Sequence, residues 1–230
     1  MNTPKKHIAV TGTKGKTTTL RIIQHAFLLN EISVWGSYGL DGRYSDGMVF
    51  EKRDDCVDYL KVKKESEVLL SEATSYILTL DNVYQKDSID IAIFTSFDDT
   101  EHMELHHTGE KYLKDKKRIF NFLKEDGIAI INRDILEFDQ ITENLTQKII
   151  TYGFDQDSDY VISDVEQSMF GTTFFLSYGD EKIGVLTKLV SEANVLNATA
   201  GIIAVLESWD MPMEKIVDSL ESFPGVKGRG

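Results

Sequence analysis

The sequence contains a single cysteine, Cys56, among its 230 residues. One thiol cannot form an internal disulfide, and it cannot supply the cluster of thiolates that a structural zinc site needs. The chain also lacks an apolar run of about 18 residues, and no signal peptide precedes the first predicted strand. These absences predict a protein of a reducing, cytoplasmic compartment that does not insert into a membrane.

Basic residues are scarce relative to acidic ones. Lysine and arginine number 25 against 38 aspartates and glutamates, which gives a formal net charge of −13. Nucleic acid or an anionic membrane would be repelled, so we expect neither as a partner. The hydrophobic content of 41% is enough to bury a large core, and the length suits one large α/β domain.

Residues 7–20 carry the strongest motif. An apolar run, Ile8-Ala9-Val10, leads into Gly12-Thr13-Lys14-Gly15-Lys16-Thr17-Thr18, and apolar residues then recur at helical spacing. This order predicts a strand, a phosphate-binding loop and a helix whose first N–H groups face an anion. Lys16 would place its charge near the β- and γ-phosphates, and the Thr17 hydroxyl would bind Mg²⁺. The alternative is a glycine-rich turn that binds nothing.

Two further segments contain candidate ligands. Glu72 closes the apolar run 67–72, and the carboxyl end of a parallel strand faces the ligand crevice, although a solvated glutamate is also common there. Residues 98–107 hold three of the five histidines together with several carboxylates. Metal binding and a solvated polar loop both fit this cluster, because it lacks the fixed spacing of a helix-borne zinc site.

Lys116 interrupts an apolar stripe. In the predicted helix 109–124 it shares a face with Tyr112, Ile119, Phe120 and Leu123. A lysine in such a position often extends its amine to solvent. A lysine held in the interior can instead lose its proton and react.

The remaining pattern predicts an α/β fold with a mostly parallel phosphate-loop sheet flanked by helices. Alternating β-branched and aromatic runs within 160–187 add a small antiparallel β-meander, and helices over 194–208 and 213–222 close the fold. We expect one domain over 1–224, with 225–230 as the start of a linker toward a C-terminal domain.

Several segments, in order, resemble the central ATP-binding domain of the Mur ligase superfamily. That family includes the peptidoglycan stem-peptide ligases and the folylpolyglutamate, poly-γ-glutamate and cyanophycin synthetases. The matching segments are 11–18 (T-G-T-[NK]-G-K-T-[ST]), 72–75 (E-x-[ST]-S), 101–104 (D-H-[LM]-D), 112–120 (Y-x-x-[AG]-K-x-x-[IL]-[FY]), 130–134 (I-[IL]-N-x-D-D), 194–198 (N-x-x-N-[AL]) and 226–229 (V-x-G-R).

The resemblance implies ATP and two Mg²⁺ sites. Thr17 and Glu72 would hold the first Mg²⁺, and His102 with Lys116, a lysine that is carbamylated in many members, would hold the second. Because residues 96–102 exceed the family spacing by one, Asp98 and Asp99 are alternative ligands. The nucleotide-binding residues that the resemblance implies are Gly12, Thr13, Lys14, Gly15, Lys16, Thr17, Thr18, Asn194, Asn197 and Arg229.

The family reaction activates a carboxylate as an acyl phosphate, which an amine attacks to give an amide, ADP and phosphate. By resemblance the chain is the core of an ATP-dependent carboxylate–amine ligase, with Lys16, Glu72, His102 and Lys116 as catalytic residues. Its partners would be ATP, a carboxylate acceptor, an amino-acid amine and a C-terminal domain or partner subunit. The alternatives are a nucleotide-binding or ATPase module and a phosphate-loop kinase of small molecules.

Overall fold

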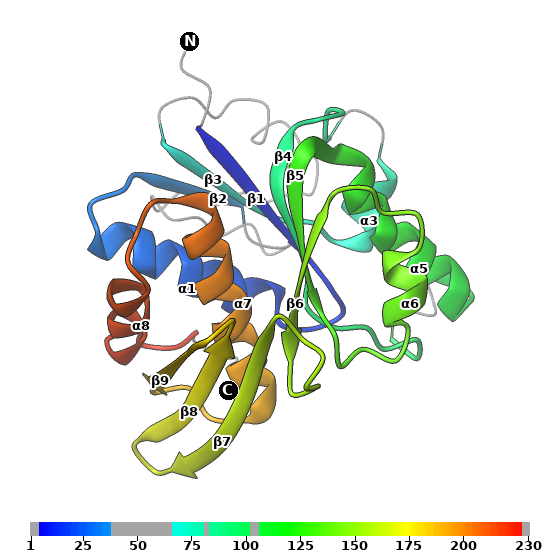
Figure 1. The fold of residues 1–230 in the computed structure, drawn as a ribbon. Helices are drawn as coiled ribbons and strands as arrows, with labels where there is room; N and C mark the ends of the chain where they lie inside the picture. Colours follow the sequence, from blue (N-terminus) through cyan, green and yellow to red (C-terminus); the bar gives the residue numbers. More distant parts are fainter. Residues whose placement is uncertain (1–4, 38–65, 81–82, 102–105, 227–230) are drawn as a thin grey trace.

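The computed structural model describes residues 5–37, 66–80, 83–101 and 106–226. Its strands belong to one sheet, in the order β2-β3-β1-β4-β5-β6-β7-β8-β9 (Figure 1). In chain order the elements are β1 (Lys6–Thr11), α1 (Lys16–Leu29), β2 (Val34–Ser37), β3 (Val68–Glu72), α3 (Ser75–Thr79), β4 (Ile89–Phe94), α5 (Gly109–Lys117), the 3₁₀ turn η1 (Arg118–Phe122), β5 (Leu123–Asn132), α6 (Phe138–Thr142), β6 (Lys148–Gly153), β7 (Tyr160–Ser168), β8 (Gly171–Tyr178), β9 (Glu181–Thr187), α7 (Glu192–Ser208) and α8 (Met213–Glu221).

The central strands are parallel and buried on both faces. β1, β3 and β4 read as near-continuous apolar runs, which is typical of strands covered by helices on both sides. In the register of the sheet, Val10 of β1 lies beside Glu72 of β3 and Ile93 of β4. The carboxyl ends of these three strands therefore meet at one edge of the sheet.

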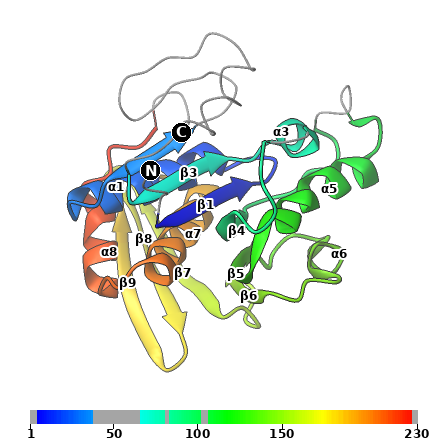
Figure 2. The ribbon, with the colours of Figure 1, turned by 90° about the horizontal axis from the view of Figure 1, so that it is seen from above.

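Helices cover the sheet on both sides. Figure 1 shows α1, α7 and α8 on one side and α3, α5 and α6 on the other, and the view from above in Figure 2 agrees. Helix α7 is buried along most of its length, as an all-round apolar helix must be. It approaches α1 closely at Gly201, where a Cβ would lie 2.7 Å from Cγ2 of Ile22.

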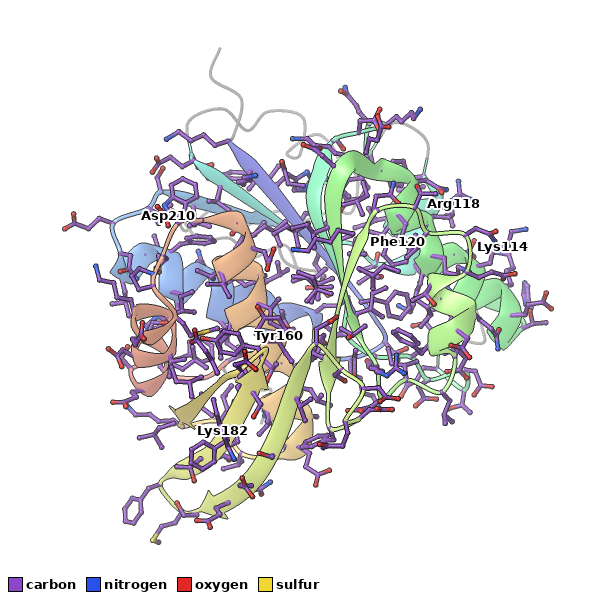
Figure 3. The ribbon with its side chains drawn as sticks, in the orientation of Figure 1. Lys114, Arg118, Phe120, Tyr160, Lys182 and Asp210 are labelled. Atoms are coloured by element: carbon purple, nitrogen blue, oxygen red, sulfur yellow. The ribbon has the colours of Figure 1, made fainter. Side chains whose placement is uncertain are left out.

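The meander is present where it was predicted. β7 pairs in parallel with β6, and β7, β8 and β9 then pair antiparallel. On β8 the residues alternate, with Phe174 and Leu176 buried and Phe175 exposed by 41%. Tyr160, labelled in Figure 3, stacks on Tyr178 across β7 and β8 at 5.3 Å between ring centroids. The predicted fold class is confirmed.

One predicted boundary is wrong. The helix expected over 109–124 ends at Lys117, continues as η1 and gives way to β5 at Leu123. Residues 125–127 lie within β5, at the point where its register with β4 shifts. The spacing of apolar residues in the sequence follows the 3.6-residue period of an α-helix. A 3₁₀ turn and a β-bulge do not follow that period, so the sequence pattern does not show where they replace the helix or interrupt the strand.

Within the described residues, none of the helices has the length and apolar character needed to cross a membrane.

Candidate nucleotide and metal site

The phosphate loop between β1 and α1 depends on two glycines. Gly12 has φ 137° and Gly15 has φ 91°, a left-handed region that side chains rarely adopt. A Cβ on Gly12 would lie 2.2 Å from Oγ1 of Thr95, and one on Gly15 would lie 2.2 Å from Oδ1 of Asn197. Both positions therefore require glycine, and the loop packs directly against β4 and α7.

Thr95 and Ser96, just after β4, fix the same loop. The Thr95 hydroxyl donates to the Lys14 carbonyl at 2.6 Å, and the Ser96 hydroxyl accepts from the Lys14 N–H at 2.9 Å. The Thr13 N–H donates to the Ser96 carbonyl at 2.8 Å. These two residues were not among the predicted site residues. Their signal in the sequence is their place directly after a buried strand, at the edge of the sheet where ligands bind.

Lys16, Thr17 and Glu72 form one polar group at the mouth of the loop. The Lys16 amine donates to the carbonyls of Gly12 and Thr13 at 2.9 and 3.0 Å, and it lies 3.9 Å from Oε1 of Glu72. The Thr17 hydroxyl donates to Oε2 of Glu72 at 2.9 Å. Glu72 is 6% exposed, so it is not the solvated glutamate that the sequence also allowed.

The Lys116 side chain lies in the interior, beneath the loop. It is 1% exposed, its amine donates to the Gly12 carbonyl at 2.7 Å, and it lies 4.5 Å from the centre of the Tyr112 ring. Burial, and then the nearby charge of Lys16, hold the pKa of the Lys116 amine well below its usual value. The side chain that was ambiguous in the sequence is therefore buried, and its amine has a lowered pKa.

The donor set at the loop suits Mg²⁺ in part. A threonine hydroxyl and a carboxylate, joined at 2.9 Å in Thr17 and Glu72, are the oxygen ligands that Mg²⁺ prefers. An amine is not such a ligand, so Lys116 fits a second Mg²⁺ only as a carbamate. Among the residues that the structure describes, no group of three or more histidine, cysteine, aspartate or glutamate side chains could hold a metal ion.

The remaining predicted ligands are His102, Arg229, Asp98 and Asp99. His102 and Arg229 lie outside the described residues. The Asp98 carboxylate accepts from the N–H and the hydroxyl of Thr100 at 3.1 and 2.6 Å, so it caps its own turn. Asp99 packs near Gly109, where a Cβ would lie 2.7 Å from the Asp99 Cβ.

Of the two asparagines in the first turns of α7, one reaches the loop. Oδ1 of Asn197 packs against Gly15, while the Asn194 side chain donates to the Val190 carbonyl at 2.8 Å. Asn197 also lies 3.3 Å from Asn194, so the two amides are neighbours. Lys14 points away, because its amine pairs with Glu101 at 3.2 Å and its side chain is 71% exposed. Thr18 is buried beneath the loop.

Beside this group lies a buried chain of polar side chains that sequence reasoning did not find. The His106 ring contacts Oγ of Ser75 through Nε2 and Oδ2 of Asp115 through Nδ1, each at 2.9 Å. These residues lie next to the elements that carry Glu72 and Lys116. Ser75 and His106 are 31 residues apart in the sequence, and His106 and Asp115 are 9 apart. These separations fit no helix or strand period, so the sequence alone does not show that the side chains meet.

The chain is similar to known ligases over almost its whole length. It is 29% identical to UDP-N-acetylmuramoyl-L-alanyl-D-glutamate--2,6-diaminopimelate ligase of Listeria monocytogenes, over 97% of this chain and 48% of the relative. The ligase of the same name from Chlamydia abortus is 27% identical, over 96% and 47%. The chain thus spans about half the length of the curated relatives it matches.

Solved structures share the fold. A structure of UDP-N-acetylmuramoyl-L-alanyl-D-glutamate--2,6-diaminopimelate ligase superposes with a TM-score of 0.80 at 27% identity, over 99% of this chain and 48% of that one. The MurF ligase of Thermotoga maritima in complex with ADP gives 0.74 at 20% identity, over 93% and 48%. The family model of the Mur ligase middle domain matches residues 10–205. The chain therefore belongs to the Mur ligase middle domain family.

Proposed function

We propose that this chain is the ATP-binding part of a ligase that joins a carboxylate to an amine. The supporting observation is that two lysines meet at one carbonyl. Lys16 and Lys116 donate to the Gly12 oxygen at 2.9 and 2.7 Å. A phosphate-loop kinase needs the first lysine, whereas a second, buried amine at the same loop corresponds to the lysine that the resemblance assigns to the second Mg²⁺.

Each residue has a part in the proposed reaction. The loop N–H groups and Lys16 would stabilise charge on the β- and γ-phosphate oxygens, and Thr17 with Glu72 would hold Mg²⁺. Bound Mg²⁺ supplies charge neutralisation between the phosphates and the incoming carboxylate. The acceptor carboxylate attacks the γ-phosphorus and ADP leaves; the amine then attacks the acyl carbon and phosphate leaves.

Lys116 must change its charge to take part. The ammonium would first lose one proton, and the neutral amine would then combine with CO₂ and lose a second proton, which leaves a carbamate anion with two oxygen ligands. Burial favours the neutral amine that this step requires. His102 would complete this second Mg²⁺ site, and Arg229 and the two asparagines would contact the nucleotide.

The relatives suggest the first substrates to try. Their names specify UDP-N-acetylmuramoyl-L-alanyl-D-glutamate as the acid and 2,6-diaminopimelate as the amine. We place the reaction in the cytoplasm, where ATP is available, and we expect a further domain or partner subunit to supply contacts to the amine. Without that part, the chain would bind and hydrolyse ATP as a module; this is the second candidate, because the chain spans 48% of its relative.

The test compares two lysine variants with a matched control. ATP binding and ADP release are measured for the chain with Mg²⁺ and bicarbonate, with and without acid and amine. Lys16→Met should weaken ATP binding at least about tenfold, since a charge-assisted hydrogen bond is worth about 1.5–3 kcal/mol. Lys116→Met should leave binding within about threefold of the wild type and abolish acid-dependent ADP release. Lys14→Met, with its exposed side chain, should change neither.

The outcomes separate the candidate functions. Acid-dependent ADP release that disappears in Lys116→Met supports the ligase. ATP hydrolysis that ignores the acid supports the module, and a phosphorylated acid that accumulates as a stable product supports a kinase. If the wild-type chain binds no ATP, the proposal is wrong.

A further inference from the structure

Four side chains form a continuous hydrogen-bonded chain next to the proposed site. Ser75 Oγ lies 2.9 Å from Nε2 of His106, Nδ1 of His106 lies 2.9 Å from Oδ2 of Asp115, and the Lys111 amine lies 2.5 Å from the same oxygen. Ser75, His106 and Asp115 are 6%, 4% and 5% exposed. Three polar side chains are thus buried together, with partners for one another.

Each buried group of this chain has a partner within it. The Lys111 amine donates to Oδ2 of Asp115, and Nδ1 of His106 contacts the same oxygen. Nε2 of His106 contacts Oγ of Ser75. Because every member is held by its neighbour, the chain acts as one restrained unit.

This unit joins α5, which carries Lys116, to α3, which follows the strand that ends at Glu72. Ser75 begins α3, three residues after Glu72 at the end of β3. Asp115 immediately precedes Lys116 in α5. The His106 ring also packs on Tyr112 at 4.7 Å between centroids, and the Lys116 amine lies 4.5 Å from the centre of that same Tyr112 ring.

Serine, histidine and aspartate in this order also occur in hydrolases, where the serine is a nucleophile. Here Ser75 is 6% exposed at the start of α3, so its oxygen lies in the interior and not at an open surface that a bulky acyl substrate could reach. The outer side of α5 is occupied by charged residues such as Lys114, which Figure 3 shows pointing outward. The burial favours a role in positioning over a role in covalent catalysis.

We propose that Asp115, His106 and Ser75 are positioning residues that fix Lys116 relative to Glu72, so that Lys116 can take up CO₂ and complete the second Mg²⁺ site. The inference rests on the proposed ligase function and deepens it. Residues that orient metal ligands typically contribute about 10–100-fold to metal affinity. Loss of the unit should therefore affect the Mg²⁺ requirement and the carbamate while ATP binding persists.

The test uses matched pairs of variants. Ser75→Ala removes the hydroxyl at one end of the chain, and Ser75→Thr keeps it. His106→Asn keeps a donor toward Asp115 but does not reach Ser75. The control is His107→Asn, because His107 is exposed and has φ 65°, a conformation that asparagine tolerates.

Three quantities are measured for each variant: ATP affinity, the ¹³C carbamate signal of Lys116 in labelled bicarbonate, and the Mg²⁺ concentration for half-maximal acid-dependent ADP release. Ser75→Ala and His106→Asn should bind ATP within about threefold of the wild type and raise the Mg²⁺ requirement about tenfold or more. Their carbamate signal should fall, and Ser75→Thr and His107→Asn should match the wild type.

Two results overturn the inference alone. One is an unchanged Mg²⁺ requirement and carbamate signal in both Ser75→Ala and His106→Asn. The other is a lower melting temperature in these variants with the Mg²⁺ requirement unchanged, which makes the unit a structural support only. A wild-type chain without a carbamate signal and without acid-dependent ADP release overturns the proposed function and the inference together.

Discussion

His7 and Lys116 are two nitrogen bases buried at opposite ends of the same sheet. At the amino end of β1, both ring nitrogens of His7 have partners: Nδ1 lies 3.1 Å from the Ser88 carbonyl and Nε2 lies 2.8 Å from the Ser71 hydroxyl. At the carboxyl end, the Lys116 amine makes one hydrogen bond within the described residues, to Gly12. Within the described residues, His7 uses both of its ring nitrogens, whereas Lys116 uses one of its donors.

The difference separates a structural role from a chemical one. Burial lowers the pKa of His7 to about 4, and a neutral ring with two partners is a stable end state. Burial also lowers the pKa of Lys116, whose amine makes a single hydrogen bond among the described residues, to the Gly12 carbonyl of the phosphate loop. A buried base with a shifted pKa at the ligand edge of a parallel sheet is a candidate functional group.

The largest expected effect tests the chemical half of this comparison. Lys116→Met keeps most of the volume of the side chain and removes the amine. Acid-dependent ADP release should fall about 10³-fold or more, because a metal-assisted step is worth several kcal/mol. Steady-state rates with a coupled ADP assay measure this. A variant with more than a tenth of the wild-type rate would contradict a role for the amine.

The pH dependence of stability tests the structural half. An unfolded histidine has a pKa near 6.5 and His7 has one of about 4, so below pH 6.5 the unfolded chain binds a proton that the folded chain does not. The free energy of unfolding therefore falls by about 3 kcal/mol, through His7 alone, as the pH falls from 6.5 to 4. Urea unfolding at pH 7.5, 5.5 and 4.5 measures the free energy of unfolding of the wild type and of His7→Phe. The advantage of the wild type should shrink as the pH falls and then reverse. A constant difference would contradict the burial of a neutral ring.

A smaller effect concerns the partners of His7 at neutral pH. His7→Phe keeps an aromatic ring beside Tyr84, on which His7 stacks at 5.9 Å, and removes the bonds to Ser71 and Ser88. The free energy of unfolding should fall by about 2 kcal/mol, since two buried partners lose a hydrogen bond. ATP affinity should stay unchanged. The matched variant His25→Phe, at a partly exposed histidine, should cost less than about 0.5 kcal/mol.

The smallest effect has the opposite sign. Because the pKa of Lys116 is lowered in the folded chain, its burial costs stability at neutral pH, and that cost diminishes as the pH rises toward the usual lysine value. Lys116→Met should therefore raise the free energy of unfolding by about 1 kcal/mol at pH 7.5. Urea unfolding of the same variant checks it. A loss of stability would show that the amine supports the fold.

The sequence predicted the sheet and the loop because their signals are local. An apolar run such as Ile89–Phe94 fits a buried strand, and the closely spaced glycines fit a tight loop, with few other structures open to either. The family resemblance, and not these local patterns, implied that Lys16, Glu72 and Lys116 share one site. The apolar stripe left two positions open for the Lys116 side chain, and the structure has the buried one, on a helix that ends at Lys117.

The contacts around the site were not predictable in the same way. Thr95 reaches Lys14 across 81 positions, and His106 joins Ser75 to Asp115 from separate elements. Such pairs depend on strand order and on how helices dock, which no local period encodes. The short helix α3 also escaped prediction, since five residues with a Thr74 cap hardly exceed one helical turn.

The most direct test of the comparison is an NMR titration of the Lys116 amine in a chain labelled with ¹³C at the lysine ε-carbons. The signal is assigned by its absence from Lys116→Met. We predict that Lys116 titrates well below the usual lysine value of about 10.4. If Lys116 titrates near that usual value, it is an ordinary ammonium, and the proposed role of its amine is wrong.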